Sequence, residues 1–334
     1  MKNDTINHGQ ASHLLRKKFV IVLGDSIQRS VYKDLVILLQ KDNLLTQAQL
    51  KKKGELEFEN DCLLEGGPMN NSTGYREVRE YRSDNHHVRF YFITRIFSEY
   101  VESILEDIRC GLKPDLVVVN SCIWDISRWN RPWELNYRDN LGKFFTQLKS
   151  ILPKESLVVW TLTMPVGNNI RGGFLVPEIA HIGSTMREDI VEANAVSSSV
   201  ASGFGLDVLD LHIHFRSQLQ HRVKDNVHWD AQAHRQISTL LLQHAAQAWG
   251  VALTGPHTVL DIQDGPNQKP VGESHTMTSG FVALTRPAPT HKLKNNYLIT
   301  ENRLAKLKWR CRFSLDARRR YWLNNMYTNY TKRK

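Results

Sequence analysis

An α/β fold, in which helices wrap a mainly parallel sheet, is predicted by two features of the 334-residue sequence. Short β-branched runs alternate with longer segments of helical period. The segment after Ser26 also places apolar residues at helical spacing, which suits a helix that packs back on the first strand. We expect strands at Phe19–Leu23, Val88–Ile93, Leu116–Asn120, Leu157–Leu162 and Val208–Leu211, and helices at residues 26–40, Phe97–Ile108, Tyr137–Leu152, Met186–Ser199 and Trp229–Trp249.

The chain divides into one folded domain and a tail. Apolar periodicity runs from about residue 14 to residue 250, which is long enough to bury a sizeable core. Residues 251–334 begin with Gly-, Pro- and Thr-rich sequence, and we expect them to be a largely disordered linker and basic tail. Within the domain, the insertion Asp42–His87 gives weak structural signals and is either a substrate lid or a surface excursion.

Charge is concentrated in the tail. Residues 291–334 carry 13 Lys and Arg against two acids, so they account for the whole net charge of +10. Trp309 and Phe313 lie among these basic residues, a combination that suits RNA or acidic lipid, although a solvated basic run is the alternative. Any electrostatic partner is therefore expected at the tail and not at the folded domain.

Location is indicated by what the sequence lacks. It has no apolar stretch of signal-peptide length at the N-terminus and none long enough for a membrane span. Its four cysteines, Cys62, Cys110, Cys122 and Cys311, are widely spaced and are expected to be free thiols in a reducing compartment. We expect an intracellular protein, in the cytoplasm or the nucleus.

The first candidate for chemistry is Gly24-Asp25-Ser26, which directly follows an apolar strand and precedes a helix. Ser26 should therefore lie at the carboxyl edge of the sheet, where open α/β sheets bind ligands. A serine in this position is either a nucleophile or a helix N-cap.

The second candidate is the turn that contains Asp225 and His228, between the last strand and the last helix. This spacing can hold a carboxylate at Nδ1 of the imidazole and leave Nε2 facing a nucleophile. Taken alone, this spacing favours Asp225 as a cap of the last helix and His228 as a half-buried surface residue. Together with Ser26, the two residues supply a nucleophile, its base and the group that orients the base.

Other site types are excluded or disfavoured. The sequence contains no GxSxG elbow, no GxGxxG and no GxxxxGK[ST], so we expect neither an α/β-hydrolase elbow nor a nucleotide cofactor. His212 and His214 would share one face of the last strand, but no acidic partner motif accompanies them, and we expect no metal. The Gly-rich loop Gly167–Gly173 is expected to be a flexible rim of a pocket.

These motifs resemble the PC-esterase family of the SGNH/GDSL hydrolase superfamily. The resemblance covers about residues 14–250 and rests on KFVIVLGDSIQRSVYKDLVILLQKD, YREVREYRSD, VRFYFITR, NSCIWDIS, DVLDLHIHFR and DNVHWD. It implies a flavodoxin-like, three-layer α/β/α fold with Ser26, Asp225 and His228 as the catalytic triad.

Three further residues are substrate or oxyanion candidates. Asn120 occupies the position of the oxyanion asparagine in the superfamily, although the surrounding block departs from the usual pattern, and it could instead cap a turn. Arg29 could anchor an acyl or phosphate group, or be salt-bridged. Trp124 could form a pocket wall, or simply be packed.

Three functions remain open at this stage. The leading hypothesis is an acyl-ester hydrolase that acts on a small-molecule or acylated substrate through an acyl-enzyme. An acyltransferase would use the same triad. A catalytically silent binding module would explain the altered oxyanion block.

Overall fold

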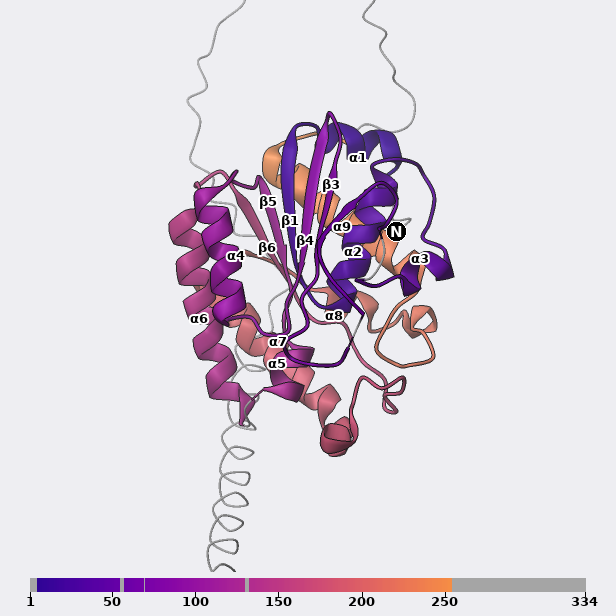
Figure 1. The fold of residues 1–334 in the computed structure, drawn as a ribbon, viewed down its shortest axis with the longest axis vertical. Helices are drawn as coiled ribbons and strands as arrows, with labels where there is room; N and C mark the ends of the chain where they lie inside the picture. Colours follow the sequence, from indigo (N-terminus) through magenta and orange to yellow (C-terminus); the bar gives the residue numbers. More distant parts are fainter. Residues whose placement is uncertain (1–4, 55–56, 69, 130–131, 254–334) are drawn as a thin grey trace, which may run out of the picture. The chain divides into compact units, whose positions relative to one another are not determined.

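The computed structural model describes residues 5–54, 57–68, 70–129 and 132–253. Its centre is a seven-stranded sheet with the order β2-β3-β4-β1-β5-β6-β7 (Figure 1). The strands are β1 (Lys18–Gly24), β2 (Cys62–Glu65), β3 (Val78–Arg82), β4 (His86–Phe92), β5 (Leu116–Val119), β6 (Leu157–Thr161) and β7 (Asp207–Leu209).

Five of these strands reproduce the predicted parallel sheet. These five strands pair in parallel with one another and lie in the order β4-β1-β5-β6-β7. Counted along the chain among themselves, this is the order 2-1-3-4-5 of a flavodoxin-like sheet. In this order the chain reverses direction across the sheet between β1 and β5, and ligands bind beyond the carboxyl ends of such strands.

Helices cover both faces of the sheet (Figure 1). Alternate residues of β1 enter different core clusters, since Val20 and Val22 belong to one and Ile21 and Leu23 to the other. The first cluster includes α1 (His8–Leu14), α2 (Ser26–Leu38) and α9 (Ala231–Trp249), and the second includes α4 (Glu99–Cys110), α6 (Trp133–Ile151) and α7 (Met186–Gly203). The predicted three-layer α/β/α fold is confirmed.

The insertion is built into the sheet. It contains α3 (Gln47–Lys51), β2 and β3, and β3 pairs antiparallel with β2 and β4. The sequence did not predict these strands because β3 carries charged residues where an alternating apolar pattern was sought. Arg79 of β3 is fully buried, and ion pairs with Glu77 and Asp61 satisfy its charge.

The prediction that His212 and His214 share one face of the last strand is wrong. His212 and His214 lie on the short helix α8 (Leu211–Phe215) and not on a strand, because β7 ends at Leu209 and Asp210 then caps the helix by accepting a hydrogen bond from the backbone N–H of Ile213 at 2.8 Å. Residues two apart on a helix do not share a face. The remaining short elements are α5 (Ile123–Arg128), η1 (Pro177–Ser184) and η2 (Leu219–His221).

Other expectations are tested only in part. None of the described helices is both long and apolar enough to cross a membrane. Cys62, Cys110 and Cys122 are free thiols, while Cys311 and the basic tail lie outside the described residues.

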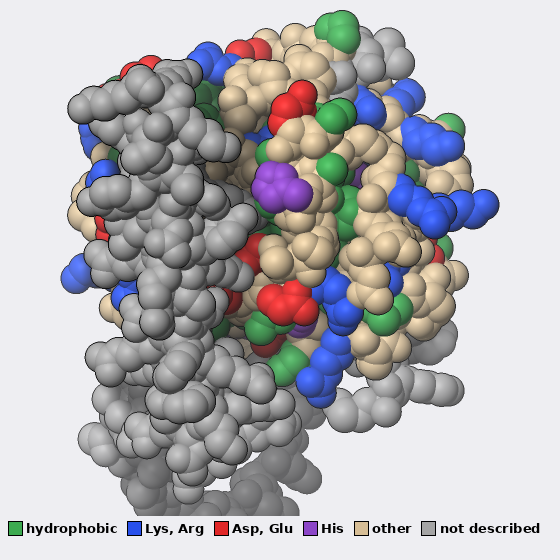
Figure 2. Space-filling view, turned by 90° about the horizontal axis from the view of Figure 1, so that it is seen from below, with side chains coloured by type: hydrophobic (Ala, Val, Ile, Leu, Met, Phe, Trp, Pro, Cys, Tyr) green, Lys and Arg blue, Asp and Glu red, His purple; other side chains and the backbone are tan. Residues whose placement is uncertain are grey.

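Viewed from the side where α5 and α8 lie, the described hydrophobic side chains form small separate spots among polar and charged ones (Figure 2).

Candidate active site

The turn after β1 presents Ser26 at the first position of α2. Asp25, not Ser26, caps this helix: its Oδ1 accepts a hydrogen bond from the backbone N–H of Ile27 at 2.8 Å. The N-cap alternative for Ser26 is therefore excluded, and its hydroxyl is free for another partner. Gly24 makes the turn possible, because a Cβ there would lie 2.3 Å from Cγ of Gln28 and 2.9 Å from the carbonyl oxygen of Asn120.

That partner is His228. Oγ of Ser26 lies 2.7 Å from Nε2 of His228, and Nδ1 of the same ring lies 2.7 Å from Oδ2 of Asp225. A carboxylate only accepts hydrogen bonds, so Nδ1 carries the proton and Nε2 of the neutral ring accepts from the serine hydroxyl. The structure thus brings the three residues, from opposite ends of the domain, into one chain of hydrogen bonds, which we call the Ser26 relay.

Asp225 is held in its charged form. Burial raises the pKa of this carboxyl, but the hydrogen bond and charge of His228, together with the backbone N–H groups of His228 and Val227, lower it to about 2. Oδ1 accepts those two backbone hydrogen bonds at 2.9 and 2.8 Å. The turn places them through Asn226, which adopts a left-handed conformation with φ of 65° that asparagine tolerates.

The Gly-rich loop after β6 supports this turn. The backbone N–H groups of Gly167 and Arg171 donate to the carbonyl oxygens of Asn226 and Asp225 at 2.8 and 2.9 Å. The Asn226 side chain donates in return to the carbonyl oxygen of Asn169 at 2.7 Å. The sequence predicted that this loop is a flexible pocket rim. Instead, three hydrogen bonds attach it to the turn that carries Asp225 and His228, and so help to position the relay.

Asn120 does not present its amide to the relay. It is buried at the end of β5, and its Nδ2 donates to the carbonyl oxygen of Thr161 at 2.7 Å and to Oγ1 of Thr163 at 3.1 Å. Both amide hydrogens are thereby used within the protein, and the oxyanion role of Asn120 stays a prediction that this arrangement does not favour. The backbone N–H of Ser26 remains suitable, because the first residue of a helix has no intrahelical acceptor.

Arg29 and Trp124 also have structural partners. The guanidinium of Arg29 is buried, forms an ion pair with Glu77 at 2.7 Å and lies over the ring of Phe92. Trp124 is buried and packs edge to face against Phe92 and Phe174, each with ring centroids 6.1 Å apart. These contacts agree with the salt-bridged alternative for Arg29 and the packed alternative for Trp124, and contact with substrate stays a prediction.

Near the relay is a small hollow, with room for about one water molecule. It lies where β1, β5 and β6 end, at the point where the strand order reverses. Asp25 and Ile27, on either side of Ser26, and Val227, next to His228, contribute to its lining. The sequence did not single out this hollow or Gln28 within it, although Gln28, Thr161 and Thr163 are polar residues close to the carboxyl ends of strands.

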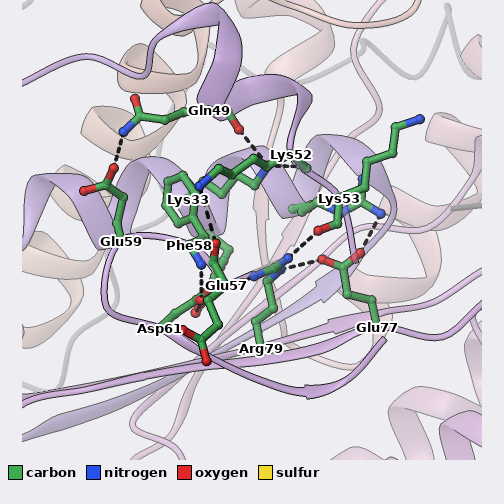
Figure 3. Close-up of polar contacts among 12 residues, drawn as sticks. Lys33, Gln49, Lys52, Lys53, Glu57, Phe58, Glu59, Asp61, Glu77 and Arg79 are labelled. Carbon is green, nitrogen blue, oxygen red and sulfur yellow. Dashed lines mark hydrogen bonds and ion pairs between the residues drawn. The ribbon is translucent and has the colours of Figure 1, made fainter. Parts of the chain in front are cut away.

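A buried set of ionic side chains, which we call the Arg79 network, joins α2 to the insertion. Arg79 donates to Glu77 at 2.6 Å and to Asp61 at 3.1 Å (Figure 3), and Glu77 also pairs with Arg29 of α2. The side chains of these four residues are at most 6% exposed. The insertion is therefore fixed to the helix that carries Ser26.

Lys33 is buried at the edge of this network. Its ammonium donates to the carbonyl oxygen of Gln49 at 2.9 Å and to that of Lys52, at the end of α3 (Figure 3). Burial, with repulsion from Arg29 and Arg79, lowers the pKa of this amine to about 7. No cluster of three or more His, Cys, Asp or Glu in the described part of the chain is arranged to hold a metal ion.

Comparison with known proteins assigns the family. The sequence is 49% identical over 304 residues to human PC-esterase domain-containing protein 1A, an alignment that covers 87% of this chain and 67% of that protein. This chain belongs to the PC-esterase domain-containing protein 1 family. It is also 49% identical over 255 residues to human PC-esterase domain-containing protein 1B, covering 75% of this chain and 59% of that relative. The resemblance noted from the sequence is confirmed.

Two further comparisons complete the picture. No family model matches the sequence. Among solved structures, a lipase/acylhydrolase from Enterococcus faecalis aligns over 71% of this chain and 99% of its own, with 15% identity and a TM-score of 0.40. An alpha/beta hydrolase enzyme from the metagenome of Lake Arreo aligns over 69% and 96%, with 13% identity and a TM-score of 0.42.

Proposed function

We propose that this member of the PC-esterase domain-containing protein 1 family is a serine-dependent hydrolase of acyl esters. The observation that carries the proposal is the Ser26 relay, with 2.7 Å between Ser26 and His228 and 2.7 Å between His228 and Asp225. The names of its relatives, PC-esterase domain-containing proteins 1A and 1B, agree with ester chemistry.

In the proposed reaction, Nε2 of His228 takes the Ser26 proton as Oγ bonds to the acyl carbon. The backbone N–H of Ser26 donates to the resulting oxyanion. The bond to the alcohol then breaks, and His228 gives its proton to the leaving oxygen. A water molecule, deprotonated by the same ring, releases the acid and restores Ser26. The ionised Asp225 stabilises the imidazolium in both steps.

One observation favours a second candidate, a catalytically silent binding module. The amide of Asn120, which should assist an oxyanion, is used within the protein. An acyltransferase that uses the same relay would differ only in the acceptor of the acyl group. Intracellular location, a domain boundary near residue 250, and RNA or acidic lipid as partner of the tail stay predictions from the sequence.

A fluorophosphonate probe tests the proposal, because it labels an activated serine and not an ordinary hydroxyl. We expect the purified full-length chain to be labelled and the Ser26→Ala variant to remain unlabelled. Ser30→Ala is the matched control, since Ser30 lies one turn along the same helix and donates to the carbonyl oxygen of Ser26. Labelling that survives Ser26→Ala, or a wild-type chain that stays unlabelled where a known serine hydrolase reacts, would contradict the proposal.

A further inference from the structure

The loop after β6 continues beyond the hydrogen bonds that attach it to the turn of the relay, and it contacts the relay again at Gly172. Gly172 and Gly173 have φ of 77° and 75°, in the left-handed region that glycine adopts without strain. A Cβ added to Gly172 would lie 3.3 Å from Cβ of Asp225, so the loop backbone packs directly against this side chain. The position of residues 172–173 therefore limits where Asp225 can lie.

Arg128, the last residue of α5, holds this part of the loop. Its Nη2 donates a hydrogen bond to the carbonyl oxygen of Phe174. Its Nη1 donates to the carbonyl oxygen of Asn71, in the insertion, at 2.8 Å. Asn71 in turn donates through Nδ2 to the carbonyl oxygen of Gly173 at 2.9 Å. These four residues, which we call the Arg128 clamp, join α5, the insertion and the loop.

Aromatic rings fix the guanidinium of Arg128 in this place. It lies over the ring of Trp124, with 4.4 Å to the ring centroid, and over the ring of Phe174, with 5.4 Å. The two rings also pack edge to face on each other. A planar guanidinium can stack on a ring and donate hydrogen bonds in its own plane at the same time, which an ammonium cannot. The packing therefore directs the donors of Arg128 at the two carbonyl oxygens.

The partners of Arg128 in the clamp are carbonyl oxygens and rings, with no carboxylate among them. Burial lowers the pKa of its guanidinium. Its Nε is buried and has no hydrogen-bond partner within the described part of the chain. A partly buried cation without a counter-charge costs stability, and such costs are expected where function requires a particular geometry. The geometry that Arg128 maintains is that of the loop beside Asp225.

We propose that Arg128 is a positioning residue of the Ser26 relay, which holds residues 172–174 against Asp225 and so keeps this carboxylate in contact with Nδ1 of His228. The inference rests on the proposed hydrolase function and adds a residue to it. Arg128 acts through the loop and not by contact with the reacting atoms, so its effect on Ser26 depends on Asp225.

Arg128→Met tests the inference on the full-length chain, because methionine keeps an apolar contact with the two rings and removes both hydrogen bonds. We expect fluorophosphonate labelling of Ser26 to slow by about 10- to 100-fold, the loss that a displacement of about 1 Å can cause in a catalytic arrangement. Arg95→Met is the matched control, since Arg95 lies over the neighbouring ring of Trp129, with 4.6 Å to its centroid. It should label at the wild-type rate. Labelling of Arg128→Met at the wild-type rate overturns the inference.

A double variant separates the positioning of Asp225 from a general loss of structure. Effects that operate through the same contact are not additive. In a chain that already carries Asp225→Asn, Arg128→Met should therefore slow labelling by about threefold or less. The same large slowing with and without Asp225→Asn would mean that the two residues act independently, and it would overturn the inference.

The proton on Nδ1 of His228 reports the same contact without a probe. Its hydrogen bond to the carboxylate of Asp225, at 2.7 Å, is of the short, charge-assisted kind that moves a proton NMR signal far downfield. At low temperature, where exchange with water is slow, Asp225→Asn identifies this signal by abolishing it. We expect Arg128→Met to broaden the signal or move it upfield, and Arg95→Met to leave it unchanged. An unchanged signal in Arg128→Met contradicts the role of Arg128.

Asn71→Ala replaces Arg128→Met as the test if the latter does not fold. Asn71 is exposed, and this change removes its hydrogen bond to Gly173 while Arg128 keeps its own. Labelling should slow by about two- to fivefold, as expected for one hydrogen bond. A wild-type rate in Asn71→Ala then counts against the clamp.

The fluorophosphonate result separates the two proposals. A labelled wild-type chain with equal rates for Arg128→Met and Arg95→Met overturns only the role of Arg128. An unlabelled wild-type chain contradicts the hydrolase function, and the NMR signal of His228 then still shows whether Arg128 holds Asp225 on the ring.

Discussion

The Ser26 relay and the Arg79 network both pair carboxylates with basic side chains, yet they differ in exposure. In the relay, the side chains of His228 and Asp225 are 37% and 27% exposed. In the network, those of Arg79, Asp61 and Glu77 are fully buried. The two regions meet on α2, which carries Ser26 at its first position and Arg29 one turn later.

Under the proposed function, the difference separates groups that must change charge during the reaction from groups that only hold the structure together. Removing one member of a buried ion pair leaves an uncompensated charge in a medium of low polarity, which strongly destabilises the fold. His228 and Asp225 of the relay, by contrast, are partly exposed to solvent. The network holds the insertion against α2, while the relay is positioned by turns and backbone hydrogen bonds.

The largest expected effect is on the relay. Asp225→Asn should slow fluorophosphonate labelling by up to about 10⁴-fold, because the amide no longer holds the proton on Nδ1 of His228. The variant should stay folded, since its side chain lies at the surface of the turn. Asp210→Asn, which changes a helix-capping carboxylate on α8, is the control and should label at the wild-type rate. Equal rates for the two variants would argue against a role for Asp225.

The next effect separates stability from chemistry. Glu77→Gln should lower the free energy of unfolding by about 3–5 kcal/mol, because Arg29 and Arg79 lose a buried counter-charge. Urea denaturation would measure this change. Glu106→Gln removes the partner of Arg109 in an exposed ion pair. This variant should change the free energy of unfolding by about 0.5 kcal/mol or less. Similar losses of unfolding free energy for Glu77→Gln and Glu106→Gln would show that the buried ion pairs of the network stabilise the fold no more than an exposed pair does.

The smallest effect concerns pH. The pKa of Lys33 is lowered to about 7 in the folded chain, from the ordinary value of 10.5 that applies when the chain is unfolded. Between these two pH values, the unfolded chain therefore keeps a proton on Lys33 that the folded chain has lost. The free energy of unfolding should therefore rise with pH, by about 2 kcal/mol from pH 7 to pH 9. Urea denaturation at both values should show this rise in the wild-type chain and not in Lys33→Met.

Lys113→Met provides the comparison for Lys33, because Lys113 also donates to carbonyl oxygens at a helix end, those of Ile108 and Arg109. It should keep the wild-type dependence on pH. If Lys33→Met also kept the wild-type rise of unfolding free energy with pH, the buried amine of Lys33 would not be the origin of that rise.

Sequence patterns predicted the parallel sheet, its covering helices and the meeting of Ser26 with Asp225 and His228. These predictions succeeded because apolar strands are recognisable and because parallel strands bring their carboxyl ends to one edge. Strand β3 escaped prediction, since the burial of Arg79 depends on partners that are distant in sequence. The hydrogen bonds of Asn120 could not be predicted for the same reason: nothing in its neighbourhood along the chain reveals that Thr161 and Thr163 will accept its amide hydrogens.

The insertion also determines how the sheet ends. Without β2 and β3, the seven-residue strand β4 would border the sheet and offer a long row of free backbone groups. In the described part of the chain, the outer strands are instead β2, with four residues and a register shift between Leu63 and Glu65, and β7, with three residues. Short and irregular borders give the strand of another molecule little to pair with. The insertion therefore protects the protein against edge-to-edge aggregation.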